Sequence, residues 1–189
     1  MNIELDHPFK LNCHNLKELV ECRNLSSYKN KLSKQSLLYP NRYEPDKYCG
    51  DGFEYLVEAI IKLSPMDNRI GIGEYKVIIT GDTGVDGCGI GINLKPATVQ
   101  CKFRIDSTKL LTTDDKLSNF IAASQNKYGV DINDIDNMLV VTTAKDIHYF
   151  TKNEMLYKKV RCVGDKQLRT LIDNNFLFWE NFKLLSENI

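Results

Sequence analysis

Along the chain, apolar residues recur in some segments at the spacing of a helix and in others alternate as in a strand. The order of these segments predicts the order of helices and strands. In residues 53–63 the apolar positions follow the i, i+3, i+4, i+7, i+8 stripe of a helix that packs on a core. The stripe consists of Phe53, Leu56, Val57, Ile60 and Ile61. Asp51 is placed to cap this helix. A shorter helix is predicted over residues 14–24, whose apolar residues also share one stripe.

A β-meander is predicted after the helix at 53–63. Its strands are expected over residues 74–80, 85–92 and 97–104, joined by turns at 81–84 and 93–96. In the last strand Val99, Cys101 and Phe103 share an apolar face. The opposite face is polar and carries Thr98, Gln100, Lys102 and Arg104. This alternation is typical of a strand with one face in the core and the other in solvent.

The second half of the chain continues the alternation of helices and strands. A helix that Thr112 or Thr113 can cap is predicted to run through Asn126. Residues 137–144 are almost continuously apolar, which indicates a central strand covered on both faces. The remaining elements are a helical turn at 152–157, a short strand at 160–163, a helix from Asp165 and an aromatic-rich tail. The order α-β-β-β-α-β-α-β-α predicts an α/β fold with a mixed sheet between helices.

A polar stretch over residues 25–52 separates the two predicted N-terminal helices and contains prolines, glycines and tyrosines. It also carries a series of cations: Lys29, Lys31, Lys34, Arg42 and Lys47. Two interpretations stay open, a solvated linker and an arm whose cations contact DNA phosphates. The predicted organisation is an N-terminal helix with a basic, tyrosine-rich extension at 1–50, followed by an α/β domain at 51–189.

Composition narrows the function classes. The chain has 189 residues, of which 42% are apolar and 26% charged, and its formal net charge is zero. A neutral protein has no global basic field, so any contact with DNA needs a local basic patch or bound cations. The six cysteines form no CxxC pair, which argues against zinc and a disulfide framework. We find no membrane-length apolar run and no signal-peptide core, and therefore expect an intracellular protein, cytoplasmic or nuclear, with no membrane partner.

Candidate chemistry gathers in residues 81–104. Asp86 belongs to one predicted strand, and Gln100 and Lys102 lie two residues apart on the next. An acid, an amide and an ammonium group at one sheet edge suit metal-assisted attack on a phosphodiester. Glu54 lies at the border of the apolar stripe of the preceding helix and is a further candidate ligand, whereas Glu58 is expected farther toward solvent.

Four sequence segments carry a family resemblance: FEYLVE (53–58), GDTGVDG (81–87), VQCKFR (99–104) and LVVTTA (139–144). In this order they resemble the PD-(D/E)xK nuclease superfamily, and most closely its Mrr-type endonuclease domains in the helicase-associated branch. Val85 replaces the proline of the family motif, and Gln100 replaces its second acid, as is usual in the Mrr branch. The resemblance implies a restriction-endonuclease-like fold with an α-β-β-β-α-β core and a Mg²⁺-dependent DNA endonuclease activity, in which Mn²⁺ can substitute.

The expected roles follow from the chemistry and from this resemblance. Asp86, Gln100, Glu54 and the backbone carbonyl of Cys101 are predicted metal ligands, and Lys102 is predicted to orient the attacking water. Asp82 is assigned to shaping the turn, with auxiliary metal contact as the alternative. The predicted phosphate contacts are Lys95 and Arg104 beside the site, together with Lys29, Lys31, Lys34, Arg42 and Lys47.

The predicted partners and the rival functions complete the expectations. Cutting both strands of a duplex needs two sites, which suggests a homodimer. A catalytically inactive nuclease-like module that binds DNA or protein is the alternative, and an unrelated α/β interaction protein is the third possibility. His7 is expected to be a terminal residue without a role.

Overall fold

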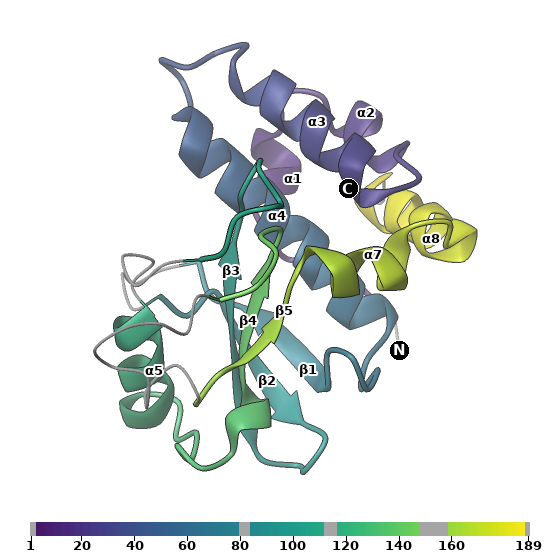
Figure 1. Ribbon diagram of the computed structural model, residues 1–189. Coiled ribbons are helices and arrows are strands. Elements are labelled where there is room, and N and C mark those ends of the chain that lie inside the picture. Colours follow the sequence, from purple (N-terminus) through teal and green to yellow (C-terminus); the bar gives the residue numbers. More distant parts are fainter. Residues whose placement is uncertain (1–2, 80–83, 112–116, 148–158, 188–189) are drawn as a thin grey trace.

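A computed structural model describes residues 3–79, 84–111, 117–147 and 159–187 (Figure 1). The predicted turn at 81–84 with Asp82, the caps at Thr112 or Thr113 and the helical turn at 152–157 fall wholly or largely outside the described residues.

The centre of the fold is a five-stranded mixed sheet with the strand order β1-β2-β3-β4-β5. Strands β1 (Ile72–Val77), β2 (Gly87–Gly91) and β3 (Pro96–Lys102) form the predicted antiparallel meander. Strand β4 (Met138–Thr142) is parallel to β3, and β5 (Arg161–Val163) is parallel to β4. The α/β class with a mixed sheet flanked by helices is therefore confirmed.

Helices cover both faces of the sheet (Figure 1). One face packs on α4 (Pro45–Leu63) and α7 (Asp165–Ile172), and α8 (Phe176–Glu187) packs on α4. The other packs on α5 (Leu117–Asn126). All five residues of β4 are buried, as predicted for a central strand.

Strand β3 is covered on both faces, so the prediction that its polar face lies in solvent is wrong. Thr98 and Gln100 are fully buried. The cause is α5, which packs on this face and brings the Ser124 hydroxyl within 2.7 Å of the Thr98 hydroxyl. Lys102, at the end of the strand, remains half-buried.

Residues 25–52 are not a solvated linker, because most of them belong to two packed helices. Helix α3 (Leu25–Ser36) begins at Asn24, whose side chain accepts a hydrogen bond from the Ser27 N–H at 2.8 Å. The buried stripe of α3 includes Leu25, Tyr28 and Leu32. Tyr28 donates to the Gly52 carbonyl at 2.7 Å, and a side chain at Gly52 would overlap Leu32. This glycine therefore allows α3 and α4 to approach closely.

Helix α4 begins at Pro45, eight residues before the predicted start at 53, with proline in its first turn. Asp51 consequently lies inside the helix and does not cap it. Its carboxylate accepts hydrogen bonds from Lys47 at 2.8 Å and from the Tyr43 hydroxyl. The helix crosses the boundary predicted between residues 50 and 51, and buried apolar residues from both sides form one cluster.

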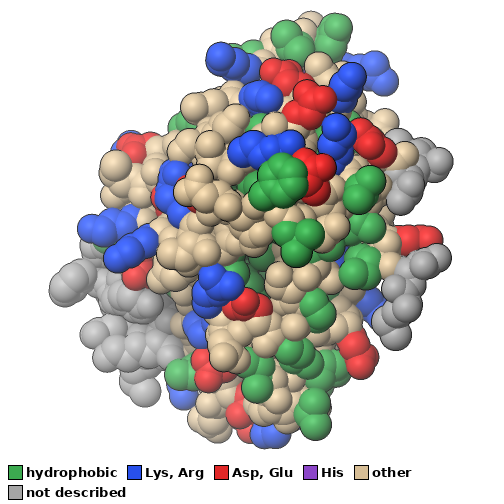
Figure 2. All heavy atoms as spheres, turned by 90° about the vertical axis from the view of Figure 1, so that its right-hand side faces the viewer, with side chains coloured by type: hydrophobic (Ala, Val, Ile, Leu, Met, Phe, Trp, Pro, Cys, Tyr) green, Lys and Arg blue, Asp and Glu red, His purple; other side chains and the backbone are tan. Residues whose placement is uncertain are grey.

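Two short helices, α1 (Phe9–Asn12) and α2 (Leu16–Val20), precede α3, and a 3-10 turn, η2 (Ile135–Asn137), precedes β4. The face that carries α7 and α8 mixes acidic and basic side chains (Figure 2). Several of them are paired, as in Arg23–Glu180 and Arg169–Asp165. In the described part of the chain, the structure has no helix both long and apolar enough to span a bilayer.

Candidate functional site

Asp86 is held between β1 and β3 by its backbone. Its N–H donates to the Val99 carbonyl and its carbonyl accepts from the Ile78 N–H, both at 2.9 Å. Its carboxylate oxygen Oδ2 accepts from the Cys101 N–H at 2.6 Å. These contacts place the carboxylate beside the end of β3, where Lys102 follows.

The charges around Asp86 perturb one another. Burial and, second, repulsion by Glu54 raise the pKa of Asp86 from 3.8 to about 7, although the Cys101 N–H and Lys102 oppose this. Burial also lowers the pKa of Lys102, and the nearby Asp86 charge partly offsets that effect. The site therefore holds neighbouring acids whose repulsion is relieved only in part by one ammonium group.

Two adjoining clefts open onto these residues. A cleft of about 630 Å³ is lined by Asp86, Lys102, Glu54 and Arg104, among others. A second, of about 390 Å³, shares Asp86 and Glu54 with the first. We call the larger one the main cleft. A ligand in the main cleft reaches both acids and the ammonium group.

Glu54 projects from α4 and is hydrogen-bonded to His7, a contact that the sequence interpretation missed. His7 Nε2 lies 3.1 Å from Glu54 Oε2. The other ring nitrogen, Nδ1, accepts a hydrogen bond from the Phe9 N–H at 3.2 Å, which assigns the proton to Nε2. His7 thus donates to Glu54 and fixes the direction of its carboxylate. The two residues are 47 positions apart, and no sequence motif joins them.

Glu58 is fully buried, so its predicted exposure to solvent is wrong. Its carboxylate accepts from the backbone N–H groups of Asp6 at 2.6 Å and His7 at 3.0 Å, and pairs with Lys62 at 2.8 Å. Glu58 therefore anchors the N-terminal segment, and Glu54 is the acid of this pair that faces the clefts.

Gln100 is brought near the site but lines neither cleft. Its side chain is buried, and within the described residues neither of its polar atoms has a hydrogen-bond partner. Gly84, at a φ of +72°, lies over it, and a side chain there would come within 2.8 Å of Gln100 Nε2. The role of Gln100 as a ligand stays a prediction.

The predicted phosphate-binding cations divide into two groups. Lys95 does not flank the site, because it precedes β3 and lies about 20 Å from Lys102 at about 3.3 Å per strand residue. It pairs with Asp134 at 2.9 Å. Lys29 is buried and lies 3.7 Å from Asp165, so it is no surface contact. Lys31 is half-buried and donates to the Glu18 carbonyl at 2.9 Å.

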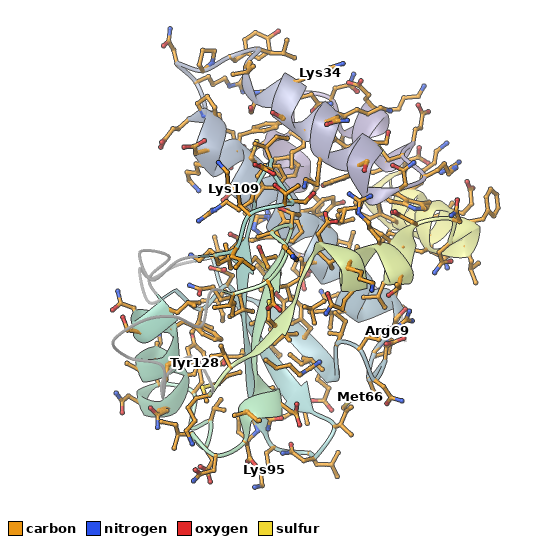
Figure 3. The ribbon with its side chains drawn as sticks, viewed as in Figure 1. Lys34, Met66, Arg69, Lys95, Lys109 and Tyr128 are labelled. Atoms are coloured by element: carbon orange, nitrogen blue, oxygen red, sulfur yellow. The ribbon has the colours of Figure 1, made fainter. Side chains whose placement is uncertain are left out.

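The other group remains accessible near the main cleft. Lys47 and Arg104 line it. Lys34, near the end of α3, and Arg42, in the loop that follows, are exposed. Figure 3 shows Lys34 on the side of the molecule opposite to Lys95.

The donors at the main cleft are oxygen atoms, which suit a hard divalent cation. They are the Asp86 and Glu54 carboxylates and the Cys101 carbonyl, which points to the same side of β3 as the N–H that binds Asp86. In the described part of the chain no three His, Cys, Asp or Glu side chains are grouped to hold a metal by themselves. The cleft suits a cation for an electrostatic reason, because a cation would relieve the repulsion between Asp86 and Glu54.

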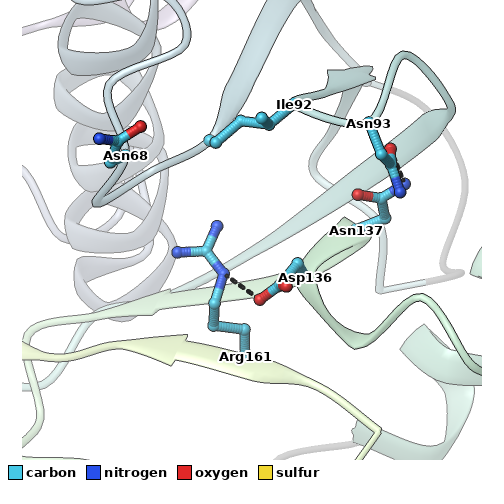
Figure 4. Close-up of a pocket in the computed structure, with 7 residues that line it drawn as sticks. Asn68, Ile92, Asn93, Asp136, Asn137 and Arg161 are labelled. Atoms are coloured by element: carbon cyan, nitrogen blue, oxygen red, sulfur yellow. Dashed lines mark hydrogen bonds and ion pairs between the residues drawn. The ribbon is translucent and has the colours of Figure 1, made fainter.

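A separate polar cavity of about 330 Å³ lies at the other end of the sheet (Figure 4). Arg161 donates there to the carbonyls of Arg69, at 2.7 Å, and Ile70, and its Nε lies 3.4 Å from Asp136 Oδ1. Asn137 donates to Asn93 at 2.9 Å. These groups bind one another and tie the loop before β1 to the sheet.

The fold and site thus define an α/β protein with a charged cleft beside the end of β3. No family model, curated protein or solved structure matches the chain.

Proposed function

We propose that this protein is a divalent-cation-dependent DNA endonuclease of the PD-(D/E)xK type. The observation that carries the proposal is the meeting of Asp86, Lys102 and Glu54 at the main cleft, where burial and Glu54 raise the pKa of Asp86. Perturbed ionisable groups that converge in a cleft are typical of catalytic sites.

Each residue has a role in this proposal. Asp86, Glu54 and the Cys101 carbonyl would hold Mg²⁺ or Mn²⁺. Such a cation neutralises phosphate charge and makes water a nucleophile near neutral pH. Lys102, half-buried beside Asp86, orients the water or binds a non-bridging oxygen of the phosphate. Arg104 and Lys47 contact the neighbouring phosphates.

The element order supports the same proposal. From α4 through β1, β2, β3 and α5 to β4, the chain follows the α-β-β-β-α-β order of the restriction-endonuclease-like core. Asp86 directly precedes β2 and Lys102 ends β3, so the acid and the lysine follow each other along the meander in the order that the resemblance implies.

The test is cleavage of supercoiled plasmid with Mg²⁺ or Mn²⁺, with and without chelator. We expect metal-dependent nicking or linearisation that Asp86→Asn and Lys102→Met abolish and Lys95→Met leaves intact. Metal-independent cleavage, or equal loss in all three variants, would contradict the assignment. Linear product without a nicked intermediate would support a homodimer with two active sites.

A DNA- or protein-binding module without catalysis is the second candidate. It is favoured by the burial of Gln100 away from both clefts, since this leaves the predicted ligand set short of one member. Retention of DNA by the protein, with no cleavage in either metal, would select this candidate. Under both candidates we place the protein inside the cell.

A further inference from the structure

The loop between α3 and α4, residues 37–44, exposes three large apolar side chains, the first of which lines the main cleft. Leu37, Leu38 and Tyr39 are 68%, 59% and 56% exposed. Leu37 itself lines the main cleft. On the far side of β3's end, Ile105 also lines the cleft and is 56% exposed. Apolar side chains at the edge of a charged cleft are expensive to leave in water and indicate a ligand with apolar surface.

Tyr39 differs from the other tyrosines of residues 25–52, all of which the structure describes. Tyr28 is buried and donates to the Gly52 carbonyl. Tyr43 donates to Asp51, and Tyr48 is buried and donates to Gln35 at 2.8 Å. Tyr39 is the one of the four that is exposed.

The exposed Tyr39 ring nevertheless packs against other aromatic rings of the protein. Its ring packs edge-on against His14, with centroids 4.9 Å apart and an interplanar angle of 76°. The His14 ring stacks on Tyr48 at 4.5 Å and 17°. The His14 N–H also donates to the Tyr48 hydroxyl at 3.0 Å. We call Tyr39, His14 and Tyr48 the aromatic platform; because its inner members are fixed, a ligand that stacks on Tyr39 orders little protein.

One cation acts on the aromatic platform, and two more lie on the adjoining helices. Arg42, in the same loop, is close enough for its charge to contribute to the lowered pKa of His14, after burial. Lys34 and Lys47 are exposed on the two helices that the loop joins. An aromatic face for a base, next to cations for phosphates, is the arrangement that binds single-stranded nucleic acid.

We propose that the aromatic platform binds an unpaired nucleotide, so that the main cleft prefers single-stranded or branched DNA to an intact duplex. Bases inside a duplex are stacked on each other and have no free face for Tyr39. A strand whose base stacks on Tyr39 passes Leu37 and enters the main cleft at Lys47 and Arg104. This inference rests on the proposed function for its choice of DNA, but binding tests it separately from cleavage.

The experiment uses the fluorescence of Tyr39→Trp. The chain has a single tryptophan, Trp179, which is buried, so a change on adding DNA reports on position 39. Single-stranded oligodeoxythymidine and a blunt duplex of equal length are titrated in chelator, where no cleavage occurs. We expect quenching by the single strand and little by the duplex, with tighter binding of the single strand.

Alanine substitution then measures the contribution of the ring. Tyr39→Ala should weaken single-strand binding about tenfold, and Tyr39→Phe should keep it, because stacking needs the ring and not the hydroxyl. Tyr128→Ala is the control: Tyr128 is half-buried just after α5, with Lys127 Nζ 5.5 Å from its ring centroid (Figure 3).

Equal quenching by duplex and single strand, or an unchanged affinity in Tyr39→Ala, would overturn the inference even if plasmid cleavage is observed. Conversely, quenching without any cleavage in Mg²⁺ or Mn²⁺ would support the aromatic platform and reject the proposed nuclease. Binding of neither DNA form in chelator would overturn the inference, whereas plasmid cleavage in Mg²⁺ or Mn²⁺ decides the proposed function separately.

Discussion

The two ends of β3 hold similar residue types in opposite electrostatic states. At the Pro96 end, Lys95 pairs with Asp134, and Asn137 donates to Asn93 and to the Pro96 carbonyl. At the Lys102 end, burial and, second, repulsion by Glu54 raise the pKa of Asp86 to about 7, and Lys102 is only a partial counter-ion. The charges at one end are paired with each other, whereas the acids at the other end are only partly compensated.

Whether the charges of a cavity are paired distinguishes a structural cavity from a candidate site better than its size or polarity does. The cavity at Arg161 is lined mainly by polar residues, but two guanidinium nitrogens donate to backbone carbonyls and the third is in ion-pair range of Asp136, although it has no hydrogen bond within the described residues. The main cleft keeps acids together that would be more stable apart. Such repulsion is retained where a cation or a proton is part of the chemistry.

The largest expected effect is on cleavage, and it compares two lysines at opposite ends of β3. Lys102→Met should lower plasmid cleavage about 10²–10³-fold, because it removes the cation beside the reacting phosphate. Lys95→Met, at the end whose charges are paired, should stay within about twofold of the natural protein. Initial rates of nicking measure both, and a similar rate for the two variants would remove the distinction between the ends.

Asp86→Asn should move activity and stability in opposite directions. The pKa of the Asp86 carboxyl is near 3.8 in the unfolded chain and about 7 in the folded protein. Because the folded protein binds this proton more tightly, the free energy of unfolding falls as the pH rises between these values. One pKa unit corresponds to about 1.4 kcal/mol. Without metal, the free energy of unfolding of the variant at pH 8 should therefore exceed that of the natural protein by up to about 4 kcal/mol, and it should no longer fall with pH over this range. Urea unfolding at pH 5 and pH 8 measures this. Asp134→Asn is the control, with a change below about 1 kcal/mol, since its partner Lys95 is exposed.

Arg161→Ala tests the end with paired charges directly. Loss of its hydrogen bonds to the Arg69 and Ile70 carbonyls should lower the free energy of unfolding by about 2–3 kcal/mol. Cleavage at a temperature where the variant is folded should not change. A variant that unfolds like the natural protein but cleaves poorly would show that this cavity, too, has a functional part.

The smallest expected effect comes from His7, which orients the Glu54 carboxylate. His7→Asn keeps an acceptor for the Phe9 N–H but is too short to reach Glu54, whereas His7→Gln extends a donor to about the position of Nε2. We expect about tenfold weaker activation by Mn²⁺ in the Asn variant and near-natural activation in the Gln variant. Manganese titrations of initial cleavage rates compare the two, and equal losses would reduce His7 to a packing role.

The sheet and the buried stripe of α4 could be predicted because they depend on periodicity alone. Positions 53, 56, 57, 60 and 61 are all buried, and the meander follows the alternation of the sequence. The position of Lys95 was also predictable: a residue at the start of a seven-residue strand cannot reach the residue at its end.

The missed features depend on partners that no local pattern identifies. The stripe of Leu25, Tyr28 and Leu32 was hidden among lysines and serines, and only packing on α4 makes it a helix in the core. Glu58 is buried because two backbone N–H groups of the N-terminal segment reach it. Gln100 is buried because α5 returns over the polar face of β3.

Helix α4 has a consequence for protein engineering. Its first half packs on α3 and its second half presents Glu54 and Glu58, so the same helix belongs to both the helical layer and the edge that carries the candidate site. A fragment that starts at residue 51 would divide this helix, strip away His7 and leave the Glu58 carboxylate without its backbone donors. Grafting the chemistry onto another scaffold would therefore require transfer of the whole helical hairpin with the sheet.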